Sequence, residues 1–113
     1  MSDCLFCKII EGNIPAEIVY RDENVVAFKD INPQAPVHLL VIPVKHIDRL
    51  TNPEAADGKV LGAVFSAIQK LAQEMQLEKG FRVVTNCGPE AGQTVYHIHF
   101  HVLGKRALNW PPG

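Results

Sequence analysis

The segment His97-Ile98-His99-Phe100-His101-Val102 decides the fold prediction for this chain. Alternate residues of a β-strand share one face, so the three imidazoles are expected on one side and the apolar side chains on the other. The apolar face explains a strand over residues 97–103. Three histidines in register are not needed to make a strand, and they indicate a metal site or a catalytic imidazole cluster.

The loop before this strand is rich in glycine and in neutral hydrogen-bond donors. Gly88 and Gly92 allow backbone N–H groups to approach a ligand closely, and a cluster of such groups binds anions. Neutral donors beside histidines suit a phosphate better than a bare metal ion. These donors are Asn86, Gln93 and Thr94. The chain has neither GxxxxGK[ST] nor GxGxxG, so P-loop and dinucleotide chemistry are not indicated.

Further segments are predicted to pair with the histidine strand in an antiparallel sheet. The apolar run of residues 37–42 predicts a central strand that is buried on both faces. Other β-branched or apolar stretches bounded by turn residues predict strands over residues 17–21, 25–28 and 81–85. Because strands outnumber helices and the connections are mostly short, these elements predict an α+β fold.

One long helix is predicted between Thr51 and Leu77, with a short helix over residues 4–11. Apolar residues of the long helix recur at intervals of three and four, so one face is expected to pack on the sheet or near an interface. Thr51 and Glu54 have the spacing of a capping box, and the regular helix is expected to begin near Lys59. Gly80 is placed where a glycine would end it.

The composition is that of one ordinary globular domain, residues 1–113. Hydrophobic residues make up 47% and charged residues 20%, which excludes wholesale disorder. The formal net charge of −1 excludes bulk attraction to nucleic acid and allows a local phosphate site. We expect neither a transmembrane helix nor a secretory signal, and therefore a cytoplasmic protein that binds neither membranes nor nucleic acid.

The triad segment has the pattern His-φ-His-φ-His-φ-φ, where φ is apolar, and it resembles the histidine triad (HIT) superfamily. Further stretches resemble the histidine triad nucleotide-binding (HINT) branch of that superfamily, and together they cover nearly the whole chain in order. They are residues 28–38, 41–46, 92–96 and 110–113. The resemblance implies a HIT-like α+β fold and a homodimer in which two chains share a continuous sheet.

The HINT resemblance also implies a purine nucleoside phosphoramidase, a hydrolase of the P–N bond in adenosine or guanosine 5′-phosphoramidates. His99 would attack the α-phosphorus to form a covalent nucleotidyl-histidine, which water then hydrolyses without a catalytic cofactor. His101 would hold the phosphate, and Thr94, where the family usually has Ser, would serve the phosphate or the leaving nitrogen. The other nucleotide-binding residues implied are Phe28, Asp30, Ile31, His38, Asn86, Gly92 and Gln93.

Cys4 and Cys7 form a CxxC, which by itself indicates a redox pair, half of a zinc site or coincidence. A zinc ion needs two more ligands, for which His46 and His97 are available. The resemblance favours this set, because several HIT proteins carry structural zinc on a CxxC and two such histidines. We therefore expect structural zinc on these four residues. Cys87 has no obvious partner.

Three other functions stay open on the sequence alone. The first is a dinucleoside polyphosphate hydrolase of the same superfamily, although the Asp30 region and the C-terminal tail favour the HINT branch. The second is a zinc hydrolase in which His97 and His99 share one metal ion. The third is a nucleotide-binding adaptor without turnover. The expected partners are a purine nucleoside monophosphate or phosphoramidate and a second copy of the chain.

Overall fold

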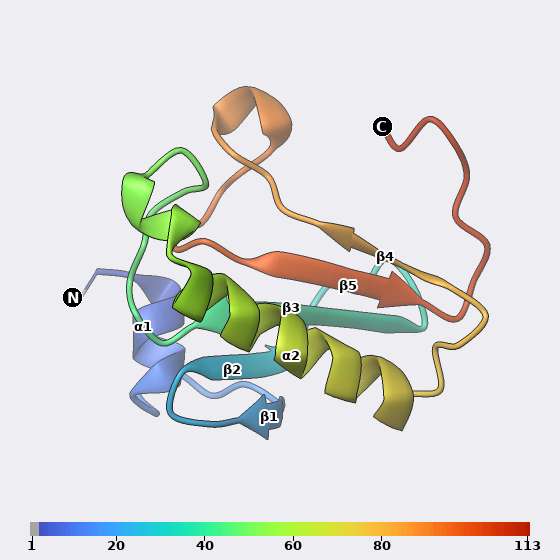
Figure 1. The fold of residues 1–113 in the computed structure, drawn as a ribbon, viewed down its shortest axis with the longest axis horizontal. Helices are drawn as coiled ribbons and strands as arrows, with labels where there is room; N and C mark the ends of the chain where they lie inside the picture. The colour runs from blue at the N-terminus through green and yellow to red at the C-terminus, as the bar shows by residue number, and fades with distance from the viewer. Residues whose placement is uncertain (1–2) are drawn as a thin grey trace.

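The computed structural model describes residues 3–113, and in them five antiparallel strands form one sheet with helices on both faces (Figure 1). The strand order is β1-β2-β3-β5-β4. The strands are β1 (Ile18–Arg21), β2 (Val25–Lys29), β3 (Val37–Pro43), β4 (Phe81–Val84) and β5 (Phe100–Gly104). The helices are α1 (Leu5–Ile10) and α2 (Gly58–Glu74), with 3₁₀ turns η1 (Pro53–Ala56) and η2 (Pro89–Ala91). The predicted α+β fold is confirmed.

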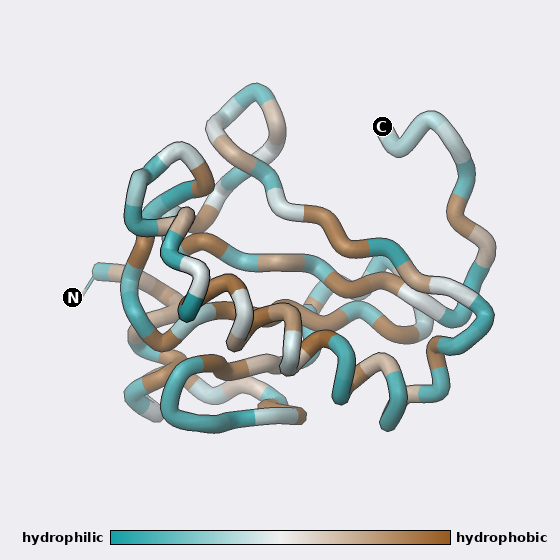
Figure 2. The backbone as a smooth tube through the Cα atoms, in the orientation of Figure 1, coloured by the Kyte–Doolittle hydropathy of each residue, from teal (hydrophilic) through white to brown (hydrophobic). Residues whose placement is uncertain are grey.

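Strand β3 is buried on both faces, as its continuous apolar run predicts. Leu39 and Val41 belong to the core beneath α2, whereas Leu40 and Ile42 belong to a second core beneath α1. Successive side chains of a strand point to opposite faces, so one central strand supplies both cores. Figure 2 shows hydrophobic segments gathered in the central strands and hydrophilic segments in the outer loops.

Helix α2 packs its apolar face on the sheet through residues three or four positions apart. The fully or nearly fully buried members of this face are Val64, Ala67, Ile68 and Leu71. Phe65 lies at the margin of the face, 47% exposed, with its ring edge-on to Phe100 at 5.9 Å. The predicted apolar periodicity is therefore confirmed, and its buried stripe is directed at the sheet.

The long helix begins at Gly58, next to the expected start near Lys59, but its predicted N-terminal capping box and its predicted C-terminal end are wrong. Asp57 is the N-cap of α2, because its side chain accepts from the Lys59 backbone N–H at 2.9 Å. The expected capping residue Thr51 lies before a separate turn, η1, which Asn52 caps instead. At the other end α2 stops at Glu74, and Gln76 adopts a φ of 58° in the role expected of Gly80.

The histidine strand begins later than its alternating pattern predicts. Strand pairing starts at Phe100 instead of residue 97, because the Ile98 N–H donates to the Ile47 carbonyl at 2.6 Å instead of joining the sheet. The predicted faces are nevertheless confirmed. Ile98 and Phe100 enter the core beneath α2, while the rings of His97 and His99 lie against Phe6 on the α1 side.

Among residues 3–113, no helix combines the length and the apolar character required to cross a bilayer.

Candidate functional site

Two of the triad histidines, His97 and His99, pack on the α1 face of the sheet against one aromatic side chain, Phe6. Its ring lies edge-on to His99 with the centroids 5.1 Å apart, and to His97 at 6.0 Å. It also contacts the ring of Phe28 at 5.4 Å. Sequence reasoning missed Phe6; the only available signal was its position inside the CxxC. Helix α1 therefore packs against two of the three triad residues, His97 and His99.

His99 is held in one tautomer by the main chain. Its side chain is 7% exposed, and its Nδ1 lies 2.8 Å from the carbonyl oxygen of His97. A carbonyl can only accept, so Nδ1 carries the proton and Nε2 keeps its lone pair. Burial lowers the pKa of His99, which keeps the ring neutral at physiological pH. His99 thus offers an uncharged, oriented nitrogen nucleophile.

His101 is held in the opposite tautomer by a chain of hydrogen bonds. The Gln34 backbone N–H donates to His38 Nδ1 at 3.0 Å, so neutral His38 carries its proton on Nε2. That Nε2 lies 2.9 Å from His101 Nδ1 and 3.4 Å from an Asp30 carboxylate oxygen. His101 Nδ1 therefore accepts, and its Nε2–H remains a donor for a ligand.

Burial is the largest cause of the low basicity of these imidazoles. It lowers the pKa of His101 to about 4, with help from the neighbouring His99 and His38 rings and against the opposing effect of Asp30. It also lowers the pKa of His97 to about 4, and the pKa of His38 in the same direction. The site therefore meets a ligand with neutral donors and acceptors at pH 7.

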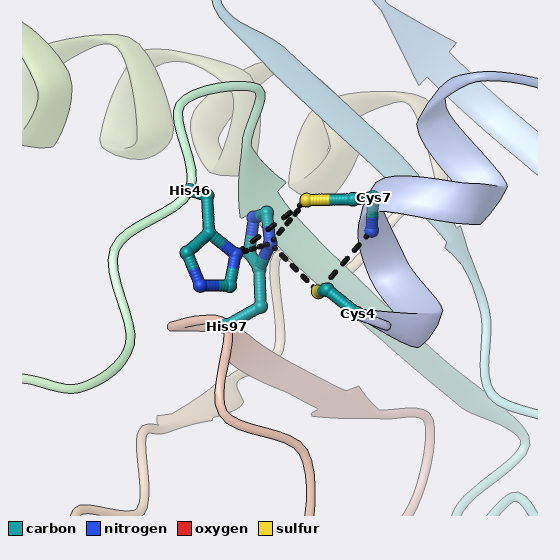
Figure 3. Close-up of side chains that lie close together, drawn as sticks. All are labelled: Cys4, Cys7, His46 and His97. Carbon is teal, nitrogen blue, oxygen red and sulfur yellow. Dashed lines mark hydrogen bonds between the residues drawn. The ribbon is translucent and has the colours of Figure 1, made fainter. Parts of the chain in front are cut away.

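A second group of side chains, Cys4, Cys7, His46 and His97, converges at the N-terminus of α1 (Figure 3). The Cys4 sulfur lies 3.4 Å from His97 Nδ1, and the Cys7 sulfur lies 3.5 and 3.6 Å from the Nδ1 atoms of His46 and His97. The two Nδ1 atoms are 3.2 Å apart. The four predicted metal ligands are thus brought together from three distant parts of the chain.

The spacing of these atoms fits a tetrahedral zinc site. Tetrahedral bonds of about 2.3 Å to sulfur and about 2.0–2.1 Å to nitrogen place sulfur and nitrogen ligands about 3.5 Å apart, and two nitrogens about 3.4 Å apart. His97 Nε2 also donates to the Pro43 carbonyl at 2.8 Å, which leaves the Nδ1 lone pair directed at the cysteines. The donor set and its hydrogen bonds therefore suit the metal.

Asp30, His38 and His101 also lie close together, but their hydrogen bonds argue against a metal ion. His38 Nε2 carries a proton, because its Nδ1 lone pair accepts from Gln34, and a protonated nitrogen cannot ligate. His99 belongs to neither of the two clusters found in the described residues. His97 and His99 thus face different surroundings, and a metal ion shared between them does not fit this geometry.

The loop between β4 and β5 is organised by the buried side chain of Gln93. Its oxygen accepts from the Gly88 N–H at 2.9 Å, and its nitrogen donates to the carbonyls of Asp48 and Val95 at 2.8 and 3.1 Å. Its polar atoms therefore shape the loop from within. The other loop residues that were expected to bind a phosphate are more accessible to solvent than Gln93. Asn86 is half-buried, and Gly92 and Thr94 are exposed.

The two apolar residues expected near a base differ sharply in burial. Phe28 is 4% exposed and belongs to the core beneath α1, whereas Ile31 is 97% exposed in the loop after β2. Ile31 is exposed because β2 ends at Lys29 and Ile31 lies in the loop that follows it. Ile31 is the most exposed large hydrophobic side chain described.

The family model of the HIT domain matches residues 11–108. The chain belongs to the HIT family. It is 50% identical to the 14 kDa zinc-binding protein of Zea mays over 99% of this chain and 89% of that protein. A HIT family hydrolase of Legionella pneumophila superposes with a TM-score of 0.95 and 50% identity, covering 98% of this chain and all of that one. A histidine triad nucleotide-binding protein of Candida albicans superposes at 0.86 with 32% identity, covering 96% and 83% of the two chains.

The low histidine pKa values predict a pH-dependent stability of this HIT protein. Between pH 6.5 and about 4 the unfolded chain protonates His101, whereas the folded chain keeps it neutral, so the unfolded state binds more protons. The contribution of His101 alone should therefore lower the free energy of unfolding by about 1–2 kcal/mol from pH 7 to pH 5. Urea denaturation at both pH values, at fixed protein concentration, measures this. His101→Gln should weaken this dependence without removing it, because burial also lowers the pKa values of His97, His38 and His99. Equal stability at both pH values in the unchanged protein would contradict the assignment.

Proposed function

We propose that this HIT protein is a hydrolase of purine nucleoside 5′-phosphoramidates, with His99 as the nucleophile. The observation that carries the proposal is the hydrogen bond from His99 Nδ1 to the His97 carbonyl, which leaves a neutral Nε2 lone pair free in a buried position. The similarity to a HIT family hydrolase and to a histidine triad nucleotide-binding protein supports the reaction class and the ligand class.

In the proposed reaction His99 Nε2 attacks the α-phosphorus, and the P–N bond breaks. The amine departs with the bonding electron pair and takes a proton from solvent. Water then cleaves the nucleotidyl-histidine, which releases the nucleoside monophosphate and returns the lone pair to His99. The His101 Nε2–H would donate to a non-bridging oxygen as negative charge develops there, and Thr94 would donate from the opposite loop.

The nucleotide is expected to lie along the β2–β3 side of the triad. Asp30 is the acceptor proposed for the ribose hydroxyls, and one of its oxygens is already positioned by the Asn32 N–H at 2.8 Å. The exposed Ile31 side chain offers an apolar surface for the base. His38 stands behind Asp30 and His101 and fixes both through its Nε2 atom.

Release of ammonia from adenosine 5′-phosphoramidate tests the proposal. His99→Ala should lower kcat/KM by at least about a thousandfold, since no covalent intermediate can form. The control Gln69→Ala, an exposed position of α2, should leave it unchanged. A parallel assay with a dinucleoside polyphosphate tests the related hydrolase activity. Nucleotide binding without turnover of either substrate would overturn the enzyme proposal in favour of an adaptor.

We also propose that Cys4, Cys7, His46 and His97 hold a structural zinc ion. Four distances among the ligand atoms, from 3.2 to 3.6 Å, are close to tetrahedral spacing, and a zinc-binding protein is among the relatives. Burial raises the pKa of the Cys7 thiol to about 11, and its hydrogen bond with Cys4 adds to this, so metal binding must displace the thiol protons. When bound, the ion would link α1, the loop after β3 and the segment before β5 without entering the reaction.

Metal analysis of the purified protein should find about one zinc per chain. Cys7→Ser should abolish this zinc and lower the melting temperature, because a bound ion stabilises only the folded state. Cys87→Ser is the matched control, since it changes the same chemistry in a cysteine outside the cluster, and it should retain the zinc. Zinc retained after Cys7→Ser, or an unchanged melting temperature on chelation, would contradict this site.

We propose further that a second copy of the chain docks on β4. This strand is an outer strand of the sheet, paired with β5 on one side. Phe81 and Val83 on β4 are 39% and 38% exposed, and an apolar outer strand is a surface for pairing with another strand. Continuation of the sheet into a partner would bury both side chains and satisfy the free backbone groups.

Sedimentation equilibrium should therefore give about twice the chain mass of 12.5 kDa. Val83→Lys should produce a monomer, because a charge on an outer strand opposes strand pairing. The same change at the opposite outer strand, Ile18→Lys, is the control, since Ile18 is 40% exposed on β1 and lies outside the proposed interface. A monomeric unchanged protein, or dissociation by Ile18→Lys alone, would refute the β4 interface.

A further inference from the structure

A cavity of about 470 Å³ lies between the loop after α2, residues 76–80, and the turn after β5, residues 105–107. Figure 1 shows the ends of α2 and β5 close together, on the side of the molecule away from α1. None of the residues proposed to bind the nucleotide or the zinc ion lines this cavity. Its volume is that of a site for a small molecule, so it is a second place where this protein could hold a ligand.

The close approach of β5 to the loop after α2 forms the cavity. A Cβ atom on Gly104 would lie 2.7 Å from a methyl carbon of the buried Leu77, so a larger residue would have to displace that side chain. The chain turns at Lys105 with a φ of 70° and at Gln76 with a φ of 58°, and both residues line the cavity. Left-handed backbone is unfavourable for residues with a side chain, so packing around the two turns must hold both walls in place.

The cavity concentrates positive charge in a chain whose formal net charge is −1. Lys79, Lys105 and Arg106 line it, together with a single carboxylate, that of Glu78. None of these four side chains takes part in the ion pairs found within residues 3–113. The three cations outweigh the one anion, so the cavity is expected to attract a negatively charged ligand.

The Arg106 guanidinium is held in place by the main chain. Its Nε donates to the Gln34 carbonyl and its Nη1 to the Ala107 carbonyl, both at 2.9 Å. Carbonyl groups are neutral, so these bonds orient the guanidinium without balancing its charge. A planar guanidinium in a fixed orientation suits a phosphate group, which it can bind through two N–H groups at once.

A purely structural role for the two lysines would be to offset the partial negative charge at the C-terminal end of α2. The last carbonyls of this helix already have partners in the main chain. Those of Leu71 and Ala72 accept from the N–H groups of Met75 and Leu77, both at 2.8 Å. The lysine ammonium groups are therefore not required to satisfy these carbonyls, and they remain available to a ligand.

We propose that this cavity binds a small anion that carries two or more phosphate groups, the class to which inorganic pyrophosphate belongs. The three cations are distributed over both walls, and together they exceed the charge of a single phosphate group. The Glu78 carboxylate repels anions, which favours a ligand with enough negative charge to engage all three cations. The site is separate from the triad, and the proposal does not rest on the phosphoramidase function.

Titration with inorganic pyrophosphate, followed through the amide signals of individual residues in NMR spectra, tests the proposal. The signals of residues 76–80 and 105–107 should shift saturably at low ionic strength, and added salt should weaken the binding. Orthophosphate and citrate are the comparison ligands. Orthophosphate should bind more weakly because it has one phosphate group, and citrate should bind more weakly because it offers carboxylates instead.

Lys105→Gly is the most informative variant, because it removes one charge and introduces the residue that best tolerates left-handed backbone. It should weaken pyrophosphate binding about threefold, as for an exposed ion pair, without lowering the melting temperature. Lys79→Gln should weaken binding to a similar extent from the opposite wall. The control Lys59→Gln removes an exposed lysine at the other end of α2 and should leave the dissociation constant unchanged.

Four outcomes would overturn the proposal. The first is the absence of a saturable shift, or shifts confined to the residues around the triad. The second is equal weakening by Lys59→Gln, which would reduce the effect to the overall charge. The third is a lower melting temperature of Lys79→Gln with unchanged binding, since the lysine would then serve the end of the helix. The fourth is tighter binding of citrate than of pyrophosphate, which would exclude the phosphate class.

Discussion

The two functional groups of this protein meet in one residue, His97, and the site depends on the hydrogen bonds that this residue makes. Its side chain joins the cysteine cluster through Nδ1 and the Pro43 carbonyl through Nε2. Its own carbonyl accepts from His99 Nδ1. A displacement of His97 would therefore disturb the cluster and also remove the hydrogen bond that orients His99, the proposed nucleophile. The fully buried position of His97, in contact with the Phe6 ring, makes such a displacement costly.

The cluster of Cys4, Cys7, His46 and His97 and the cluster of Asp30, His38 and His101 both contain histidines, but their hydrogen bonds suit them to different ligands. Both contain histidines within a few ångströms of other ligating groups. At the cysteine cluster the Pro43 carbonyl accepts a hydrogen bond from His97 Nε2–H. The proton of His97 is therefore on Nε2, and the Nδ1 lone pair faces the sulfur atoms. At the Asp30 cluster a backbone N–H occupies the lone pair of His38 Nδ1, so a proton faces His101. One cluster is suited to a cation and the other to an anion.

The sequence predicted which face each residue occupies and where the long helix begins, but it did not predict the start of β5 or the residues that cap the helix. Period-two alternation placed Ile98 and His99 on opposite sides of the sheet correctly, because burial selects the side of each residue. The start of β5 was missed, since it depends on a hydrogen bond from Ile98 to the distant Ile47, which leaves no local signal. The start of α2 was predicted to within one residue, but its cap was missed, because the Asp57 side chain accepts from the Lys59 N–H while Thr51 lies before the separate turn η1.

The site residues show the same division. The CxxC and the two histidines were assigned as one cluster from spacing and resemblance, and the fold brings all four together. Residues that act through their neighbours were not foreseen. Phe6 carries no chemical label, and its role follows from ring contacts between α1 and the triad. The sequence of the loop suggested that the Gln93 amide was free to bind a phosphate. In the fold its oxygen accepts from the Gly88 N–H and its nitrogen donates to the Asp48 carbonyl.

The absence of charge on the buried imidazoles has a consequence for how an anion is held. A phosphate bound among neutral rings interacts through N–H dipoles, which cost little to bury compared with an unpaired cation. An anionic ligand also favours the protonated form of a nearby histidine, so binding opposes the effect of burial on the pKa of His101. The more negative charge the phosphoryl group develops, the more strongly the His101 N–H bond is polarised toward it. In the proposed reaction a neutral site of this kind would therefore bind the phosphoryl group more strongly in the transition state than in the substrate, as catalysis requires.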